Sequence, residues 1–169
     1  MTPFRKRIQA PNEKKEANHT IRELSFSTSL KPILTAFPYE DWSSKKIADQ
    51  IRDYWDAWRQ AIPEAFEEDK SGNYVLLRTP GVFSLHAVAL FIWKVCEKNR
   101  VEPTTKKIKE MLDNSSKAAK KANLPDMASA KYWESDNTDG AAVFGSMKGF
   151  SMLADNIKDF LKDGGYSLD

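Results

Sequence analysis

Large apolar side chains recur every three or four residues between Ser43 and Pro63, which is the repeat of one face of a helix. They are Ile47, Ile51, Tyr54, Trp55, Trp58 and Ile62. Ser43 or Ser44 is a suitable N-cap, and Pro63 bends or interrupts the helix. We interpret the aromatic stripe as core packing, in preference to a platform on which nucleic-acid bases stack.

A second segment, residues 82–96, is apolar on almost every face. Thr79 as N-cap and Pro80 at the first helical position predict where its helix begins. Because a helix without a polar face is buried all round, we expect residues 82–96 to be the central helix of the fold. Ser84 and His86 interrupt the segment, which is shorter than the ~18 apolar residues of a membrane span. We interpret His86 as a hydrogen-bonded core side chain, in preference to a metal ligand or a catalytic base.

Residues 105–123 predict a third helix, with a narrow apolar stripe beneath several lysines. The stripe comprises Ile108, Met111, Leu112, Ser115, Ala119 and Ala122. Pro125 ends this helix, because proline cannot continue the helical hydrogen bonding.

Residues 139–161 predict the final helix, capped by Thr138 or Asp139 and stopped by Gly164 and Gly165. Its apolar stripe comprises Val143, Phe144, Met147, Phe150, Ala154, Ile157, Phe160 and Leu161.

This final pattern contains two glycines, Gly145 and Gly149, and each costs a helix interior about 1 kcal/mol relative to alanine. Spaced four apart, they would share one face of the helix, flanked by Ser146 and Lys148. One interpretation is that the missing side chains let a neighbouring helix pack closely. The other is that the backbone and Lys148 face a ligand phosphate or a partner.

The rest of the chain predicts little regular structure. Residues 1–25 are expected to be an irregular arm or connector in which residues 4–8 form a short strand, and Pro32 is expected near the start of a short helix. Residues 74–77 read as a short extended run. The sequence therefore predicts a mainly α fold: a compact bundle of four to five helices around the buried helix 82–96, with an irregular N-terminal arm and at most one or two short strands. The domains are expected to be 1–25, 26–165 and a tail, 166–169.

The composition is that of a soluble globular domain, with 41% hydrophobic and 30% charged residues among 169. Cys96 is the only cysteine, so no internal disulfide can form, which fits a reducing cytoplasm. The basic start, MTPFRKR, has no apolar region of the kind found in secretory signals. We expect a cytoplasmic protein without a membrane partner.

The net charge of +2 is distributed in blocks. Residues 1–39 and 100–132 are basic, whereas 40–70 and 133–169 are acidic. The second basic block contains six lysines that lie on one predicted helix: Lys106, Lys107, Lys109, Lys117, Lys120 and Lys121. Such a run is typical of the solvated side of a helix, and it is also what attracts phosphates.

The sequence holds no recognisable catalytic set. Its two histidines, His19 and His86, lie far apart, and a zinc site needs more cysteine and histidine than the chain offers. The stretch GSMKG lacks the Walker pattern, in which the second glycine directly precedes Lys and Ser or Thr. We therefore expect no catalytic residue, no metal and no cofactor.

Four stretches, taken in order, are similar to one family: HTIRELSFSTSLKPIL, IADQIRDYWDAWRQAIPEAF, YVLLRTPGVFSLHAVALFIW and YWESDNTDGAAVFGSMKGFSMLADNIKDFL. This succession, over residues 4–162, resembles the C-terminal half of the DGQHR-domain proteins, which include the Dnd-type regulator of DNA phosphorothioation. The motif that names the family, Asp-Gly-Gln-His-Arg, belongs to the N-terminal half and does not occur here. The resemblance implies a separated helical half, whose first residues lead from a ParB-like domain.

The resemblance assigns motif positions in two places. Arg78, Thr79 and Gly81 match the turn before the apolar helix. The late motif is matched by Trp133, Gly140, Gly145, Ser146, Lys148 and Gly149. No catalytic role follows for any of them.

The leading hypothesis from the sequence is a non-catalytic helical module of a bacterial DNA-modification or phage-defence system that contacts DNA or a partner subunit. The residues expected to contact nucleic acid are Arg78, Lys117, Lys120, Lys121 and Lys148. The alternative is a protein-interaction or scaffold domain unrelated to nucleic acid, whose partner supplies the missing N-terminal half. An enzyme is a third hypothesis, which no constellation of residues favours.

Overall fold

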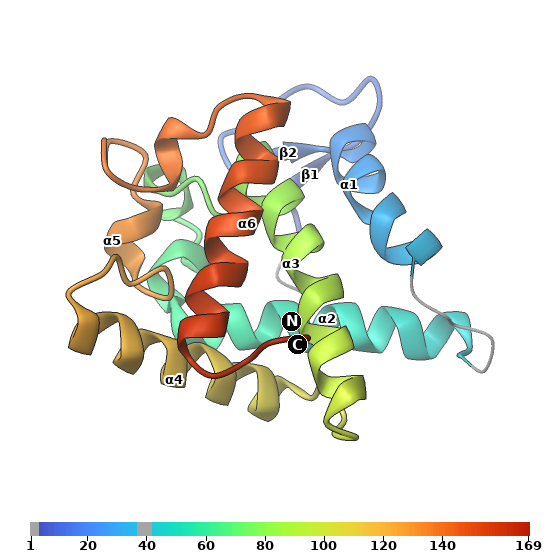
Figure 1. Cartoon of the computed structure of the whole chain (residues 1–169). Helices are drawn as coiled ribbons and strands as arrows, with labels where there is room; N and C mark the ends of the chain where they lie inside the picture. The colour runs from blue at the N-terminus through green and yellow to red at the C-terminus, as the bar shows by residue number, and fades with distance from the viewer. Residues whose placement is uncertain (1–3, 37–41) are drawn as a thin grey trace.

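A computed structural model of the chain describes residues 4–36 and 42–169 (Figure 1). Its α-helices are α1 (Glu23–Ala36), α2 (Ser44–Ala61), α3 (Thr79–Lys98), α4 (Thr105–Ala122), α5 (Ala130–Trp133) and α6 (Met147–Asp163). Shorter elements are the strands β1 (Ile8–Gln9) and β2 (Ile21–Arg22) and the 3-10 turns η1 (Pro63–Phe66), η2 (Ser71–Asn73) and η3 (Ala141–Val143). The fold is mainly α with two short strands, as the sequence predicts.

Helix α3 is the centre of the bundle, which confirms the prediction for residues 82–96. Helices α1 and α6 pack along its sides, and α2 and α4 lie across the lower part of the view in Figure 1. Twelve of its 20 residues are buried, Cys96 among them. Within the described residues, α3 alone is long and apolar enough for a membrane span, and 67% of its apolar window is buried inside the protein. It is the buried core helix of this bundle.

Helix α2 has the N-cap and the buried aromatic face that its sequence pattern predicts. The side chain of Ser43 accepts a hydrogen bond from the backbone N–H of Lys46, so Ser43 is the N-cap that the sequence predicts. The helix buries Tyr54, Trp55 and Trp58 against its neighbours. The aromatic stripe is therefore core, as interpreted from the sequence.

The start of α3 lies one residue earlier than expected. Arg78 occupies the N-cap position, Thr79 is the first helical residue and Pro80 is the second. Before it, residues 74–77 do not form the expected extended run. Tyr74 makes a single antiparallel bridge with Glu134, and the chain then turns with Val75, Leu76 and Leu77 buried. They are not extended because they form a tight turn, whose carbonyl groups pack against the start of α3.

Gly81 is required by that turn. A Cβ atom added at Gly81 would clash with the carbonyl oxygen of Leu76 and would lie 2.6 Å from the carbonyl oxygen of Val75. No side chain fits there without moving the backbone.

The predicted start of the last helix is wrong. Residues 139–146 form a turn that contains η3, and α6 begins only at Met147. The N-cap is Ser146, whose hydroxyl accepts a hydrogen bond of 3.1 Å from the N–H of Gly149. Val143 and Met147, predicted on the buried stripe, are exposed. The amphipathic pattern includes residues 139–146, but the backbone of these residues forms the turn that leads to the Ser146 N-cap.

Gly145 and Gly149 consequently do not share a helix face. Gly145 precedes the helix, and a Cβ atom there would meet nothing within 4 Å. Gly149 lies in the first turn, where a Cβ atom would approach the backbone of Phe144 to 3.0 Å. Its close neighbour is the preceding turn of the chain, so the predicted packing of another helix onto both glycines is wrong. Nothing in the structure explains the glycine at 145.

Pro32 lies inside α1, ten positions along a helix of 14 residues, and not near its start. It is exposed, so the carbonyl group of Thr28, which the missing N–H would have bonded, is on the solvent side of the helix. A helix tolerates proline best where water can replace the lost hydrogen bond.

The N-terminal segment packs onto the bundle. Ile8 and Gln9 of β1 pair in parallel with Ile21 and Arg22 of β2. The strand thus overlaps the predicted residues 4–8 only at Ile8, because residues 4–7 form a turn. The segment is fixed by the buried Arg7, whose Nη2 donates a hydrogen bond of 2.6 Å to the carbonyl oxygen of Phe66.

Candidate functional site

The outer face of α4 gathers the predicted lysines. Thr104 caps the helix at one end, and Asn123, in the left-handed conformation with φ 55°, ends it. The inward stripe is Ile108, Met111, Leu112, Ser115 and Ala119. Ala122, which the sequence placed on this stripe, is exposed in the last turn of the helix.

Three of the lysines on α4 are held by acidic neighbours. The Nζ atoms of Lys107 and Lys109 lie 2.8 Å from a carboxylate oxygen of Glu110 and 2.6 Å from one of Asp113. The hydrogen bond that Lys107 donates to the carboxylate of Glu110 raises the pKa of Lys107. Lys120 lies 3.3 Å from Asp126 and is still 71% exposed.

The other three lysines of this helix, Lys106, Lys117 and Lys121, make no ion pair within residues 4–36 and 42–169. Lys117 and Lys121 are exposed and four residues apart, so they extend from the same face of the last two turns. Their charges are available to a ligand.

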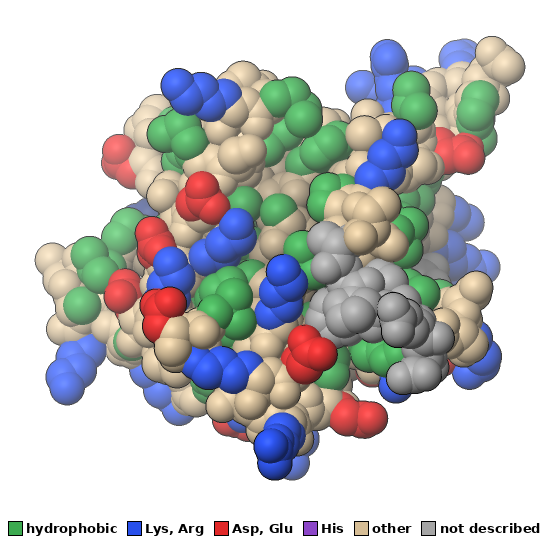
Figure 2. Space-filling model, turned by 45° about the vertical axis from the view of Figure 1, so that its right-hand side comes forward, with side chains coloured by type: hydrophobic (Ala, Val, Ile, Leu, Met, Phe, Trp, Pro, Cys, Tyr) green, Lys and Arg blue, Asp and Glu red, His purple; other side chains and the backbone are tan. Residues whose placement is uncertain are grey.

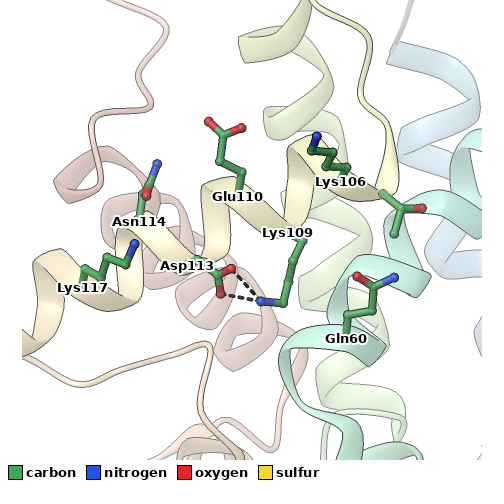
Figure 3. A pocket seen from close by; sticks show the side chains of 8 residues that line it. Gln60, Lys106, Lys109, Glu110, Asp113, Asn114 and Lys117 are labelled. Carbon is green, nitrogen blue, oxygen red and sulfur yellow. Dashed lines mark hydrogen bonds and ion pairs between the residues drawn. The ribbon is translucent and has the colours of Figure 1, made fainter.

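A hollow of about 490 Å³ runs beside α4, between this helix and the end of α2 (Figure 3). It is lined by Gln60, Thr105, Lys106, Lys109, Glu110, Asp113, Asn114 and Lys117. Figure 3 shows the Lys109–Asp113 ion pair directed toward the Gln60 side, with Lys117 farther along the helix. The hollow is shallow and polar, so it suits a charged surface group rather than an enclosed small molecule.

The five residues predicted to contact nucleic acid do not form one surface. Lys117, Lys120 and Lys121 lie together on the last turns of α4. Arg78 is half-buried, and its Nη2 donates to the carbonyl oxygen of Gly72. Lys148 is exposed in the first turn of α6, whereas the other end of α6 meets α4, where Gly164 lies against Ser115 (Figure 1). Lys148 is therefore separated from the α4 lysines.

The remaining motif positions shape the backbone. Trp133 is fully buried, and its Nε1 donates a hydrogen bond of 2.9 Å to the carbonyl oxygen of Met127. A Cβ atom at Gly140 would clash with the carbonyl oxygen of Tyr132, so this glycine is fixed by the turn after α5. Gly81, Ser146 and Gly149 likewise lie where the turns before α3 and α6 meet these helices, and Thr79 is the first residue of α3.

His86 is the hydrogen-bonded core side chain that the sequence predicts. The indole Nε1 of Trp55 donates to its Nε2 at 3.0 Å, and its Nδ1 lies 2.8 Å from the hydroxyl oxygen of Ser29. That hydroxyl donates at 2.6 Å to the carbonyl oxygen of Phe26. Since the indole can only donate, Nε2 accepts and the imidazole carries its proton on Nδ1. Burial lowers the pKa of His86 to about 3, so the ring is neutral, and its hydrogen bonds join α3 to α1 and α2.

A second hollow was not indicated by any pattern in the sequence. It measures about 300 Å³ and lies between the N-terminal segment, α1 and α2. Its lining comprises Phe4, Arg5, Ile8, Phe26, Ala48, Ile51, Arg52 and Trp55. The three segments meet only in the folded chain, so no local motif could have indicated it.

Among residues 4–36 and 42–169, no three His, Cys, Asp or Glu side chains gather closely enough to hold a metal ion. Charges are interspersed on the face shown in Figure 2, where basic and acidic side chains alternate with hydrophobic ones. Comparisons with protein-family models, curated proteins and solved structures found no match to this chain.

Proposed function

We propose that this chain is a non-catalytic helical module that contacts the phosphate backbone of DNA through the outer face of α4. The observation that carries the proposal is the group formed by Lys117, Lys120 and Lys121 on the last two turns of one helix. Two of these lysines have no acidic partner in the part of the chain that the structure describes, and the third is 71% exposed. Clustered lysines attract phosphates.

The α4 face suits backbone contacts rather than the reading of bases. Lysine is a flexible point charge, and base recognition is dominated by planar, bidentate side chains such as arginine, asparagine and glutamine. The carboxylates of Glu110 and Asp113 interrupt the basic face. They oppose phosphates at its middle, so binding would concentrate on the turn that carries Lys117, Lys120 and Lys121.

The resemblance to the C-terminal half of the DGQHR-domain proteins supplies the biological setting of the proposal. In that setting the chain acts in a cytoplasmic DNA-modification or phage-defence system of a bacterium, beside a partner subunit.

Binding of a labelled DNA duplex, followed by fluorescence anisotropy, tests the proposal. The double variant Lys117→Ala/Lys121→Ala removes two unpaired charges from α4. We expect its affinity at low salt to fall about tenfold or more, and the slope of log K against log salt to decrease by about two. Titrations between about 50 mM and 200 mM salt measure both quantities.

The matched control is Lys158→Ala/Lys162→Ala on α6. It also removes two lysines, but each of these is paired with an aspartate three residues earlier, at 2.9 Å. This control should bind as the wild type does. Equal affinity and salt slope for both double variants, or no binding by the wild type at low salt, would refute the proposal.

A further inference from the structure

The hollow beside the N-terminal segment has a fixed aromatic floor. The ring of Phe4 meets the rings of Phe26 and Trp55 edge-on, with centroids 4.7 and 4.8 Å apart. Trp55 is in turn held by its hydrogen bond to His86. Arg7 fixes the segment that forms the third wall, through its bond to the carbonyl oxygen of Phe66. The cavity is therefore formed before any ligand arrives.

The size and lining of this hollow suit one large apolar side chain. About 300 Å³ is at the lower limit of ligand pockets and holds a phenylalanine or leucine side chain. Phe4, Ile8, Phe26, Ile51 and Trp55 supply most of the lining, and the polar groups are those of two arginines. A nucleobase fits it less well, because the donor groups on the edges of a base need acceptors that the side chains of this lining do not offer.

The charges at the rim distinguish the two arginines. Arg5 is exposed and makes no ion pair with the described residues. The guanidinium of Arg52 lies 2.9 Å from Asp49 and 3.8 Å from Asp53, so two carboxylates already share it. Arg5 is therefore the group that can accept a new anion, and arginine pairs with carboxylates through two parallel hydrogen bonds.

We propose that this hollow binds an acidic segment of a partner protein, which inserts one large apolar side chain and pairs a neighbouring carboxylate with Arg5. The inference does not rest on DNA binding by α4, because it concerns a different face and different residues. Its occupant is a peptide, since a peptide supplies an apolar side chain and a carboxylate on adjacent residues.

Three capped tripeptides test the chemistry: acetyl-Asp-Phe-Asp-amide, its uncharged counterpart acetyl-Asn-Phe-Asn-amide, and acetyl-Asp-Ala-Asp-amide, which lacks the apolar side chain. Each is titrated into the ¹⁵N-labelled full chain, and the backbone amide shifts of Ala48, Ile51 and Arg52 are followed. We expect the first peptide to bind with about tenfold higher affinity than either of the others.

Two pairs of variants test whether the peptide binds in this hollow and beside Arg5. Ala48 is exposed at the edge of the hollow, so Ala48→Trp adds a ring there without disturbing the core, whereas Ala122→Trp adds the same ring at an exposed position on α4. The first variant should abolish binding and the second should leave it unchanged. Arg5→Gln should remove the preference for aspartate over asparagine, and Arg52→Gln should reduce that preference less.

Each alternative outcome overturns the proposal. Equal binding of the aspartate and asparagine peptides eliminates the role of Arg5, and equal binding of the alanine peptide eliminates the apolar side chain. Binding that survives in Ala48→Trp locates the peptide elsewhere. The amide spectrum of each variant shows whether it is folded, so a loss of binding in a folded Ala48→Trp chain is attributable to the hollow.

Discussion

The polar cluster around His86 and the polar face of α4 both contain hydrogen-bonded side chains, neutral and buried in the first and charged and exposed in the second. His86 is completely buried, and each of its ring nitrogens has a partner. In the Lys109–Asp113 pair the side chains are 26% and 49% exposed, so water competes for the same atoms. Burial makes the first cluster part of the architecture, since leaving any of its atoms unpaired is costly. Exposure leaves the second free to exchange partners, which a binding surface needs.

Two glycine substitutions, one in the interior and one in open space, are expected to show the largest difference in stability. Gly81→Ala would drive a methyl group into the carbonyl oxygens of Leu76 and Val75 in the interior, so we expect a loss of about 4 kcal/mol in the free energy of unfolding. Gly145→Ala meets nothing within 4 Å, and we expect a change of about 0.5 kcal/mol or less, in the stabilising direction. Urea denaturation followed by far-ultraviolet circular dichroism measures both. A Gly81→Ala chain as stable as wild type would contradict the close turn before α3.

His86→Leu tests the interior cluster itself. The substitution leaves the indole N–H of Trp55 buried without an acceptor and removes one of the two partners of the Ser29 hydroxyl, which still donates to the carbonyl oxygen of Phe26. We expect the free energy of unfolding to fall by about 3 kcal/mol. The additional change Trp55→Phe removes the orphaned donor, so the double variant should lose less than the sum of the two single variants. Strict additivity would show that the network is not coupled.

The pH dependence of stability should follow from the same histidine. Burial lowers the pKa of His86 from 6.5 to about 3, so the unfolded chain binds the proton first as the pH falls. The stabilisation from the neutral ring is complete above pH 6.5 and is lost as the pH falls toward 3. Wild type should lose about 1.4 kcal/mol per pH unit within that window relative to His86→Leu. Parallel slopes for the two chains between pH 6.5 and 4 would exclude a buried neutral His86.

The smallest effect is expected on α4. Lys109→Met removes one partner of an exposed ion pair, and such pairs contribute about 0.5 kcal/mol or less. Thermal unfolding of Lys109→Met and Asp113→Asn at two salt concentrations measures it. A loss comparable to that of His86→Leu would mean that this pair is structural, and that the comparison with the interior does not hold.

The helices with strong periodicity could be predicted from the sequence. In α2 the apolar residues follow the helical repeat and Ser43 caps the start, so the pattern and the cap agree. In α3 the continuous apolar run 82–96 and Pro80 near the start indicate a buried helix, although the N-cap is Arg78 and not Thr79. The start of α6 could not be predicted in this way, because Val143 and Phe144 continue its period although the backbone bends at Ser146. In α1 the exposed Pro32 has only a local cost, while the helix is held by packing against α3.

The two candidate surfaces also differ in whether the sequence could predict them. The lysines of α4 could be predicted because all of them lie on one helix, whose repeat fixes their face. Which of them are unpaired depends on acidic side chains such as Asp126, which lies beyond the end of the helix. Phe4, Ala48 and Arg52 come together beside the N-terminal segment only in the folded chain, so the hollow that they line has no signature in the sequence.

Cys96 gives this protein a natural reporter of its own opening. The thiol is 1% exposed within the central helix, and burial raises its pKa to about 11, so a disulfide reagent cannot modify it in the closed state. It is the only cysteine in the sequence, so every labelling event reports the same atom. The labelling rate of the unmodified chain therefore measures how often its centre is exposed to water.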